Sequence, residues 1–277
     1  MNYKLSIVLF ALLLLTSCNN SNTTSLDELN LKGRVLSVKA ISYEAESKFG
    51  EIVKGDIDFS GNSLFSFNEA GMIIDKSFYD WDGDLDRKEI SVYDEKGRIS
   101  EVNEYDEDGD LYAKTVFEFV DDIIVSQIRY DVDGEVEFHI KYENDGRNII
   151  RGEYIVSEYN KGDYWENKLN GSKLVESISY DNKGGKGSTS TYNTNTKLVK
   201  VELPDYSIEV SYNETGDVDK TLNARFTEHS FSIHEEGSVY YYEYEYDSNN
   251  NWVKRITYKG EHKKPELITE RIIKYYN

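Results

Sequence analysis

The sequence predicts an all-β protein: an antiparallel β-meander built of tandem hairpin repeats, arranged as an open, curved or loosely rolled sheet. Three observations predict this fold. A motif of aromatic, Asp or Asn, two polar residues, Gly, any residue and aliphatic recurs along the chain. Neighbouring copies in the best-conserved stretches lie 12 or 14 residues apart, which fits one strand plus one turn. Tyr, whose ring suits a half-buried strand, occurs 23 times, against two prolines.

Each copy of the motif has the chemistry of a tight turn. The Asp at its first turn position accepts hydrogen bonds from backbone amides just ahead, and the Gly three residues later adopts positive φ. Asn250 replaces this Gly in the last copy, and Asn is the next most tolerated residue there. We interpret Phe119-Val-Asp-Asp as a copy that has lost its Gly. The remaining copies are Phe67–Ile73, Tyr79–Leu85, Tyr93–Ile99, Tyr105–Leu111, Tyr130–Val136, Tyr142–Gly146, Tyr180–Gly184 and Tyr212–Val218.

The strands between these turns have no cleanly apolar face. The aliphatic residue after each Gly and the next aromatic residue are an even step apart, as Ile73 and Tyr79 are, so both lie on one face. Arg87 and Glu101 fall on that face, while Ile90 falls on the other. We therefore expect an open sheet rather than a well-packed sandwich.

The repeat has irregular stretches. Its period breaks between about residues 152 and 204, where the Gly-, Ser- and Thr-rich segment Lys183–Thr191 is predicted to be a flexible loop. Helix signals are almost absent from the domain, although Thr24–Leu31 has room for one short turn. The β-domain is expected to begin near Leu31.

The first residues have the form of a lipoprotein signal peptide. One positive charge, Lys4, precedes an apolar run that ends at Leu15 and is too short to span a membrane comfortably. Leu15-Thr-Ser-Cys18 resembles the lipobox of bacterial lipoproteins, which implies cleavage before Cys18 and a lipid on its thiol. The alternative is an ordinary signal peptide with a chance cysteine. The predicted organisation is a signal peptide at 1–17, the lipidated Cys18 with a flexible tether at 18–30, and a β-repeat domain at 31–277.

Location and charge limit the partners of the domain. Asn19, in place of the Asp associated with inner-membrane retention, favours an extracytoplasmic position on the outer membrane of a Gram-negative bacterium, in a leaflet that the sequence leaves open. The lipid on Cys18 makes the membrane one partner. The chain has 52 acidic and 32 basic residues, a net charge of −20, so we expect no nucleic-acid partner. Three explanations for this charge remain open: a protein or glycan partner, a divalent cation, or solubility alone.

The repeat resembles the YD repeats, Tyr-Asp-x-x-Gly, of RHS and teneurin-type proteins, over roughly Leu31 to Asn277. Together with the lipobox, the chain resembles RHS-like repeat lipoproteins of Gram-negative bacteria. The full repeat continues with Asn-Leu, whereas here the Asn position holds Asp84, Arg98, Asp110 or Glu135. Large RHS proteins enclose a toxin in a shell of strands. This chain is too short for that shell and shows no toxin domain, so the resemblance implies the repeat fold without encapsulation.

Calcium is the sharpest metal candidate. Two turns match the first five positions of an EF-hand loop, but Leu85 and Leu111 stand where its sixth position needs Gly. Ser91 and Phe117 stand where the bidentate Glu is needed. The alternative is that these acids only shape the turns. They are Asp80, Asp82, Asp84, Asp106, Asp108 and Asp110.

Aromatic side chains are the candidates for ligand binding. Trp81, Trp165, Trp252 and the run Tyr240–Tyr246 could form a platform for a glycan or an extended peptide. The alternative is that these rings form cross-strand pairs that hold the sheet together.

We predict no catalytic residues and no cofactor. The four histidines lack metal-ligand spacing, no nucleophile or phosphate-loop motif occurs, and no carboxylate pair stands out among the many acids. The predicted function is that of a non-catalytic binding or scaffold module of the cell envelope. The alternatives are a carbohydrate-binding or carbohydrate-active surface lipoprotein, and a module that adds a partner's strand to a free sheet edge.

Overall fold

The structure is a computed structural model that describes residues 24–80, 82–226, 231–234 and 236–277. It is all-β apart from one short helix, and its strands form antiparallel hairpins in chain order, as predicted. Two compact units are present, the first made of Ser91–Asn103 and Leu111–Pro204, the second of Ser25–Ile90, Glu104–Asp110 and Asp205–Asn277. The predicted signal peptide, Cys18 and Trp81 lie outside the described residues.

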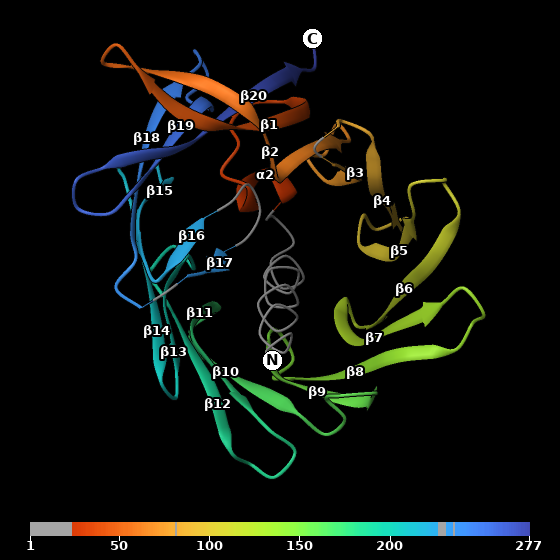
Figure 1. Ribbon diagram of the computed structural model, residues 1–277. Coiled ribbons are helices and arrows are strands. Elements are labelled where there is room, and N and C mark those ends of the chain that lie inside the picture. Colours follow the sequence, from red (N-terminus) through yellow and green to blue (C-terminus); the bar gives the residue numbers. More distant parts are fainter. Residues whose placement is uncertain (1–23, 81, 227–230, 235) are drawn as a thin grey trace. The chain divides into compact units, whose positions relative to one another are not determined.

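The first unit is a meander in which each strand pairs antiparallel with the next (Figure 1). Its strands are β5 (Ile99–Tyr105), β6 (Leu111–Val120), β7 (Ile123–Asp131), β8 (Val136–Asn144), β9 (Ile149–Ser157), β10 (Tyr164–Asn170), β11 (Lys173–Tyr180), β12 (Lys186–Tyr192) and β13 (Leu198–Leu203).

The second unit contains the first and the last strands of the domain. Its elements are α2 (Ser25–Glu28), β1 (Val35–Lys48), β2 (Glu51–Phe67), β3 (Ile73–Tyr79), β4 (Leu85–Tyr93), β14 (Tyr206–Tyr212), β15 (Val218–Leu222), β16 (Ala224–Phe226), β17 (Phe231–Ile233), β18 (Val239–Tyr246), β19 (Trp252–Lys259) and β20 (Lys264–Tyr275). The pairing order is β14–β15–β18–β19–β20–β1–β2–β3–β4, and β16 and β17 form a separate two-stranded sheet.

The expectation of an open sheet is wrong for this unit. Strand β1 pairs with β20 from Val35 opposite Tyr275 to Glu44 opposite Leu267. The terminal strands, which an open meander would leave as free edges, therefore satisfy each other's backbone groups. The sequence pattern could not show this pairing, because it joins segments more than 200 residues apart.

The predicted turn chemistry is confirmed. In the β3–β4 hairpin the Asp80 amide donates to the Asp84 carbonyl, 3.0 Å, and the Gly83 amide donates to the Asp80 carbonyl, 3.2 Å. Gly83 has φ 86°, and Asn250 takes the same role with φ 62°. The register shifts by one residue at each such turn, between Phe78 and Tyr79 here, which is the expected bulge.

Two local predictions are corrected. The Phe119-Val-Asp-Asp segment holds a two-residue turn with Asp121 and Asp122 at φ 48° and 66°, rather than a degenerate copy of the motif. The predicted loop Lys183–Thr191 is largely β12, paired with β11 and β13. A Cβ at Gly187 would lie 2.8 Å from Ser179 Oγ, so a small residue here marks close packing between β12 and β11.

The N-terminal edge of the domain lies earlier than predicted. The short turn expected within Thr24–Leu31 is α2, whose Leu26 is buried and donates its amide to the Gly71 carbonyl, 3.2 Å. Leu26 and Leu31 pack with Phe65 and other apolar side chains of β1 and β2. Residues 25–30, placed in the tether by the sequence, are thus part of the folded unit.

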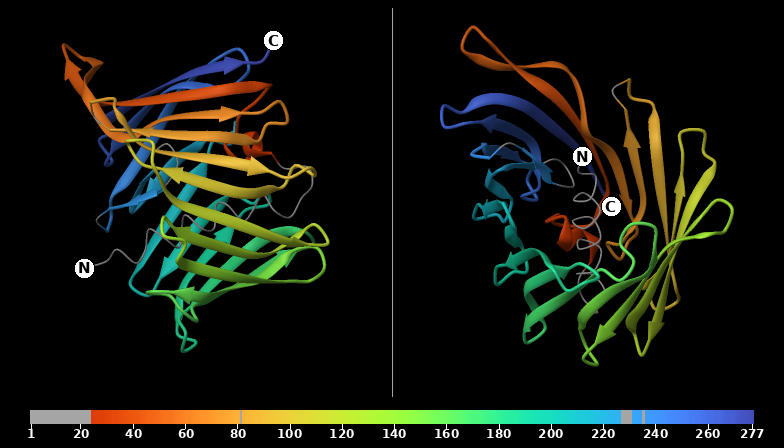
Figure 2. Two further views of the ribbon diagram at one scale, coloured as in Figure 1. Left: turned by 90° about the vertical axis from the view of Figure 1, so that its right-hand side faces the viewer. Right: turned by 60° about the horizontal axis from the view of Figure 1, so that its bottom comes forward.

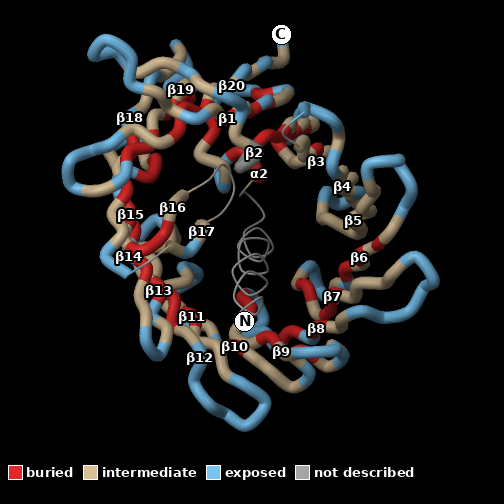
Figure 3. Tube along the Cα trace, in the orientation of Figure 1, coloured by how far each residue is buried: buried red, intermediate tan, exposed pale blue. Residues whose placement is uncertain are grey.

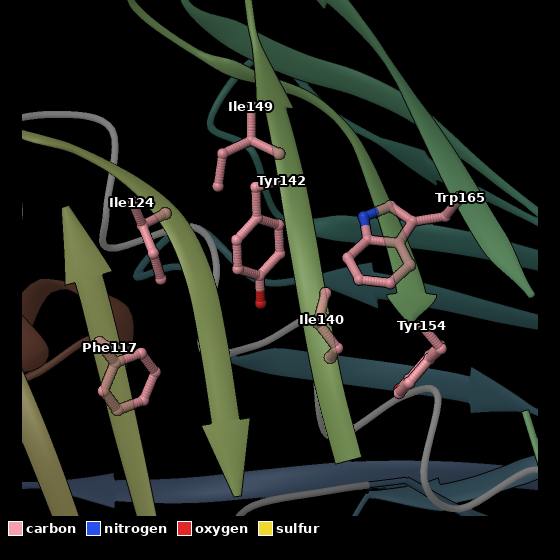
Figure 4. Packing of buried hydrophobic residues seen from close by; sticks show 7 residues of the cluster. All are labelled: Phe117, Ile124, Ile140, Tyr142, Ile149, Tyr154 and Trp165. Carbon is pink, nitrogen blue, oxygen red and sulfur yellow. The ribbon is translucent and has the colours of Figure 1, made fainter. Parts of the chain in front are cut away.

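Each unit has its own apolar layer, and exposed residues gather at the hairpin turns (Figure 3). Figure 4 shows the layer of the first unit, where side chains from β6 to β10 lie together. Trp165 is its largest member and contacts Tyr142 and Tyr154 edge-on, with ring centroids 6.1 and 6.0 Å away. Gly152 opposite Trp165 leaves room for the indole, because a Cβ there would lie 2.1 Å from the ring.

Candidate binding site beneath the β16–β17 hairpin

A group of polar side chains is buried on one face of β18 and β19 in the second unit. Tyr240, Tyr242, Arg255 and Thr257 are all within a few per cent of complete burial. Tyr242 lies opposite Thr257 in the ladder, and Tyr244 lies opposite Arg255, so these side chains share a face. We call Tyr240, Tyr242, Arg255 and Thr257, together with Arg225 and Glu266 beside them, the polar cluster.

Asn223 places the β16–β17 hairpin over this face. It has φ 62°, which reverses the chain after β15. Its side chain then holds both sides of the reversal: Nδ2 donates to the Ser207 carbonyl, 2.7 Å, and Oδ1 accepts from the Gly237 amide, 2.6 Å. Its carbonyl accepts from the His234 amide, 3.0 Å. One residue therefore fixes where β16 and β17 lie.

The hairpin contacts the tyrosines directly. The Phe226 amide donates to Tyr242 Oη, 2.7 Å, and that hydroxyl also lies 3.0 Å from Thr221 Oγ1. The Phe226 ring meets the Tyr242 ring edge-on at 6.3 Å, and the His234 ring lies 5.2 Å from that of Tyr240. These contacts close the cluster off from solvent on the side of the hairpin.

Arg255 lies among aromatic rings. Its guanidinium carbon is 5.0 Å from the centroid of Trp252, 5.3 Å from that of Phe226 and 5.9 Å from that of Tyr242. Its Nη2 donates to Thr269 Oγ1 at 3.4 Å. Ring faces attract a desolvated cation, which offsets part of the cost of burying this charge.

Four other buried atoms of the cluster have no hydrogen-bond partner among the described protein groups: Tyr240 Oη, Thr257 Oγ1, Arg225 Nε and Glu266 Oε2. Arg225 Nη1 and Glu266 Oε2 are 3.8 Å apart, an ion pair too long for a hydrogen bond. Buried polar groups are normally hydrogen-bonded. The four atoms comprise one obligate donor, one acceptor and two hydroxyls that do both.

The tyrosines of this face stay protonated at neutral pH. Burial, and then the Glu266 carboxylate, raise the pKa of Tyr240. Burial also raises the pKa of Tyr242 and of Tyr244. Each phenol is thus a neutral group able to donate a hydrogen bond, and none is a base near neutral pH.

Of the tryptophans predicted to form a platform, the two that the structure describes are buried. Trp165 is 7% exposed in the first unit and Trp252 is 5% exposed in the second. Both take part in ring packing between strands, and Trp252 also has the Arg271 guanidinium 3.5 Å from its centroid. Of the run Tyr240–Tyr246, the even-numbered tyrosines share one face of β18, where they are buried or half-buried, and Tyr241 lies on the other face, so the run forms no exposed platform.

Two of the six candidate calcium ligands, Asp80 and Asp106, cap their turns. Asp80 Oδ1 accepts the amides of Asp82 and Asp84 at 2.9 and 3.0 Å, and Asp106 Oδ1 does the same for Asp108 and Asp110. Desolvation and the neighbouring Asp80 and Asp84 raise the pKa of Asp82. Within the described ranges, no group of three or more His, Cys, Asp or Glu side chains is arranged to hold a metal ion.

The polar cluster itself was not predicted from the sequence. In the sequence, Arg255 looks like an ordinary strand residue. The bulge between Glu245 and Tyr246 shifts the register, so the sequence does not show that Arg255 lies on the same face as the tyrosines. Arg225 and Glu266 come from segments that show no copy of the motif. The one available signal was the alternating Tyr run itself, which marks an unusually aromatic strand.

No helix in the described part of the chain combines the length and the apolar character needed to cross a membrane.

Comparison with known proteins shows limited similarity. The model of a family described as an uncharacterised protein matches residues 57–154. No curated protein matches the sequence significantly. Among solved structures, a porin-like protein from Bacteroides uniformis is 9% identical, with a TM-score of 0.43, over 88% of this chain and 99% of that one. The Tc holotoxin pore of Photorhabdus luminescens is 10% identical, with a TM-score of 0.30, over 79% of this chain and 15% of that one. A LolA superfamily protein from Nitrosomonas europaea is 7% identical, with a TM-score of 0.18, over 95% of this chain and 93% of that one.

Proposed function

We propose that this protein is a non-catalytic binding module of the cell envelope, anchored by a lipid on Cys18, and that the polar cluster takes a small, uncharged polar ligand. The lipobox at Leu15–Cys18 supports the anchor, and Asn19 supports the outer membrane as its location. The net charge of −20 speaks against nucleic acid as the partner.

The observation that carries the proposal is the set of four buried polar atoms that have no hydrogen-bond partner in the described part of the chain. Leaving such a group unsatisfied costs about 1–3 kcal/mol, which a folded protein does not normally accept four times in one place. A ligand with hydroxyl or amide groups would supply both the acceptor that Arg225 needs and the donor that Glu266 needs. Water would supply them too, so the experiment has to separate the two.

The proposal contains no catalytic step. The hydroxyls of the cluster hold their protons, since burial raises the pKa of Tyr240 and Tyr242. They are therefore suited to donate hydrogen bonds to a bound molecule rather than to accept its protons.

A carbohydrate is the second candidate ligand. Sugars combine hydroxyls with apolar ring faces, and the cluster combines unsatisfied hydroxyls with the rings of Phe226, Tyr242 and Trp252. This version of the proposal places the sugar beneath the β16–β17 hairpin rather than on an exposed tryptophan platform.

Thermal unfolding with a panel of neutral hexoses and free amino acids tests the ligand. A ligand present at about 100 times its Kd adds about 2.7 kcal/mol of stability, a readily measured rise in Tm. We expect Tyr240→Phe and Thr257→Val to remove the rise, and Tyr241→Phe, on the same strand but the other face, to keep it. Two results contradict the proposal: no compound raises the Tm of the wild type, or the rise is equal in the wild type and in all three variants.

The anchor is tested separately. We expect metabolic labelling with a fatty acid to mark the wild-type protein and not Cys18→Ala, which would also leave the membrane fraction. Labelling that persists in Cys18→Ala would refute the anchor while leaving the ligand site untouched.

A further inference from the structure

The β1–β2 hairpin extends beyond the strands on either side of it. Strand β20 pairs with β1 only as far as Glu44, and β3 pairs with β2 only from Ser63 onward. Ala45–Lys48 and Glu51–Lys54 pair only with each other. Figure 2 shows this hairpin, in orange, projecting from its unit in both views. A free two-stranded hairpin contributes little to stability, so folding alone gives no reason for its length.

The tip of the hairpin carries an aromatic residue in an unfavourable conformation. Lys48 pairs with Glu51 across a two-residue turn in which Phe49 has φ 55° and Gly50 has φ 87°. Such a turn favours Asn at its first position, because a bulky side chain is strained at positive φ. Phe49 is also fully exposed to solvent. Neither the turn nor the packing of the protein accounts for Phe at this position.

The side chain at the tip, rather than the backbone edge, is the feature that can engage a partner. The pairing of β1 with β2 is interrupted by irregularities between Ala40 and Ser42 and between Tyr43 and Ala45. A Cβ at Gly55 would lie 2.9 Å from Glu46 Oε1, so the Glu46 side chain covers β2 at this position. Bulges of this kind twist an edge and hinder the addition of a further strand.

The charge of the hairpin indicates the chemistry of the partner. Residues 44–58 include five acidic residues and two lysines. Lys48 pairs with Glu46 at 2.5 Å, and Lys54 pairs with Glu270 at 2.5 Å, so the lysine charges are already offset. The surroundings of Phe49 are therefore acidic and suit a basic rim.

An acidic tip is repelled by anionic lipid head groups and by a second copy of this acidic chain. The tip also lies far from Val35, where the first strand begins, since the 14 residues of β1 span about 46 Å at about 3.3 Å each. We propose that Phe49 is the anchor residue of a docking site for another protein, one that presents an apolar pocket with a basic rim. This inference is independent of the polar cluster.

Site-specific photocrosslinking in the living cell tests the inference. The full-length lipoprotein would carry benzoylphenylalanine at position 49 or, as a matched control, at Val132, which is 69% exposed at the tip of the β7–β8 hairpin. We expect position 49 to give one adduct with a different protein, at least about tenfold stronger than any adduct from position 132. In isolated membranes, raised salt should weaken this adduct.

A conservative variant separates docking from folding. Phe49→Asn relieves the strain at positive φ, so we expect its Tm to be equal to or above that of the wild type. Membranes containing Phe49→Asn should compete for the partner about 30-fold less well than wild-type membranes, as expected for loss of an aromatic anchor. The inference is overturned by an adduct with a second copy or with lipid, by equal adducts from both positions, by no adduct, or by undiminished competition from Phe49→Asn.

Discussion

The apolar layer of β6–β10 and the polar cluster of β16, β18, β19 and β20 are both built on antiparallel hairpins, yet their chemistry is opposite. In the first, the buried phenol of Tyr142 donates to Gln127 Oε1 at 2.7 Å, and the other members, Tyr154 among them, are aliphatic or aromatic. In the second, Tyr240 Oη is buried beside Arg225 and Glu266 without a hydrogen-bond partner among the described residues. The repeat therefore determines turns and register, while the face of each strand is free to carry apolar side chains in one place and polar ones in another.

The largest expected effect lies in the apolar layer. A Cβ at Gly152 would lie between 2.1 and 2.6 Å from three atoms of the Trp165 ring, and neither residue has space to move. We expect Gly152→Val to destabilise the protein by about 3 kcal/mol or more, as overpacking does in a filled core. Urea denaturation measures this loss.

A double-mutant cycle provides the control. In the Trp165→Ala background the new side chain fills the space left by the indole, so Gly152→Val should cost much less there. Equal costs in the two backgrounds would show that the close approach to Trp165 is not the cause.

Alkaline pH should weaken both units. Burial raises the pKa of Tyr192 in the first unit to about 12, and burial together with the Glu243 carboxylate raises that of Tyr258 in the second to about 12. An unfolded tyrosine has a pKa of about 10, so above that pH the unfolded chain loses protons that the folded chain keeps. Stability is then fully present below about pH 10 and falls as pH rises toward 12, by up to about 2–3 kcal/mol for each group.

Tyr192→Phe and Tyr258→Phe test the two contributions one at a time. Each variant should show a flatter dependence of the urea midpoint on pH between 9 and 12 than the wild type. A wild-type slope in both variants would rule out these phenols as the origin of the alkaline loss.

A matched pair of hydroxyl deletions contrasts the two layers directly. Tyr142→Phe leaves Gln127 Oε1 without its donor, so we expect a loss of about 1–2 kcal/mol. Tyr240→Phe removes a buried hydroxyl that has no partner within the described ranges, so we expect no loss, or a gain of a few tenths of a kcal/mol, in the absence of ligand. Equal losses in the two variants would mean that Tyr240 Oη makes a hydrogen bond in the folded protein, for example to a tightly bound water molecule.

The turns could be predicted from the sequence because their chemistry is local. Asp80 and Gly83 carry the whole signal within four residues, and the same holds for the other copies. The pairing of β1 with β20 and the meeting of Arg225 with Glu266 are long-range events that no local pattern contains. Counting alternate residues also fails across a bulge, where the register slips by one, so the buried face of β19 could not be identified.

The smallest expected effect concerns a turn whose sequence does not match the motif. Between β12 and β13, Asn193 Oδ1 accepts the amides of Asn195 and Lys197 at 2.9 and 3.1 Å, and Thr196 stands at φ 58° where the other copies have Gly. This is the same turn as the one that Gly184 closes, at φ 81°, in the preceding hairpin. The motif missed it because a β-branched residue is disfavoured at positive φ.

Replacing each of these residues by the other measures how much stability the Thr costs at this turn. Thr196→Gly should raise stability by about 1 kcal/mol, because relief of left-handed strain outweighs the greater entropy of Gly in the unfolded chain. Gly184→Thr should lower it by about 1–2 kcal/mol, because it introduces the same strain into a turn that lacks it. Thermal and urea unfolding measure both changes. If Thr196→Gly were destabilising, the hydrogen bond from Thr196 Oγ1 to the Asn195 carbonyl, 2.6 Å, would have to stabilise the turn by more than the strain costs. Thr196 would then be a favourable residue for this turn rather than a weaker substitute for Gly.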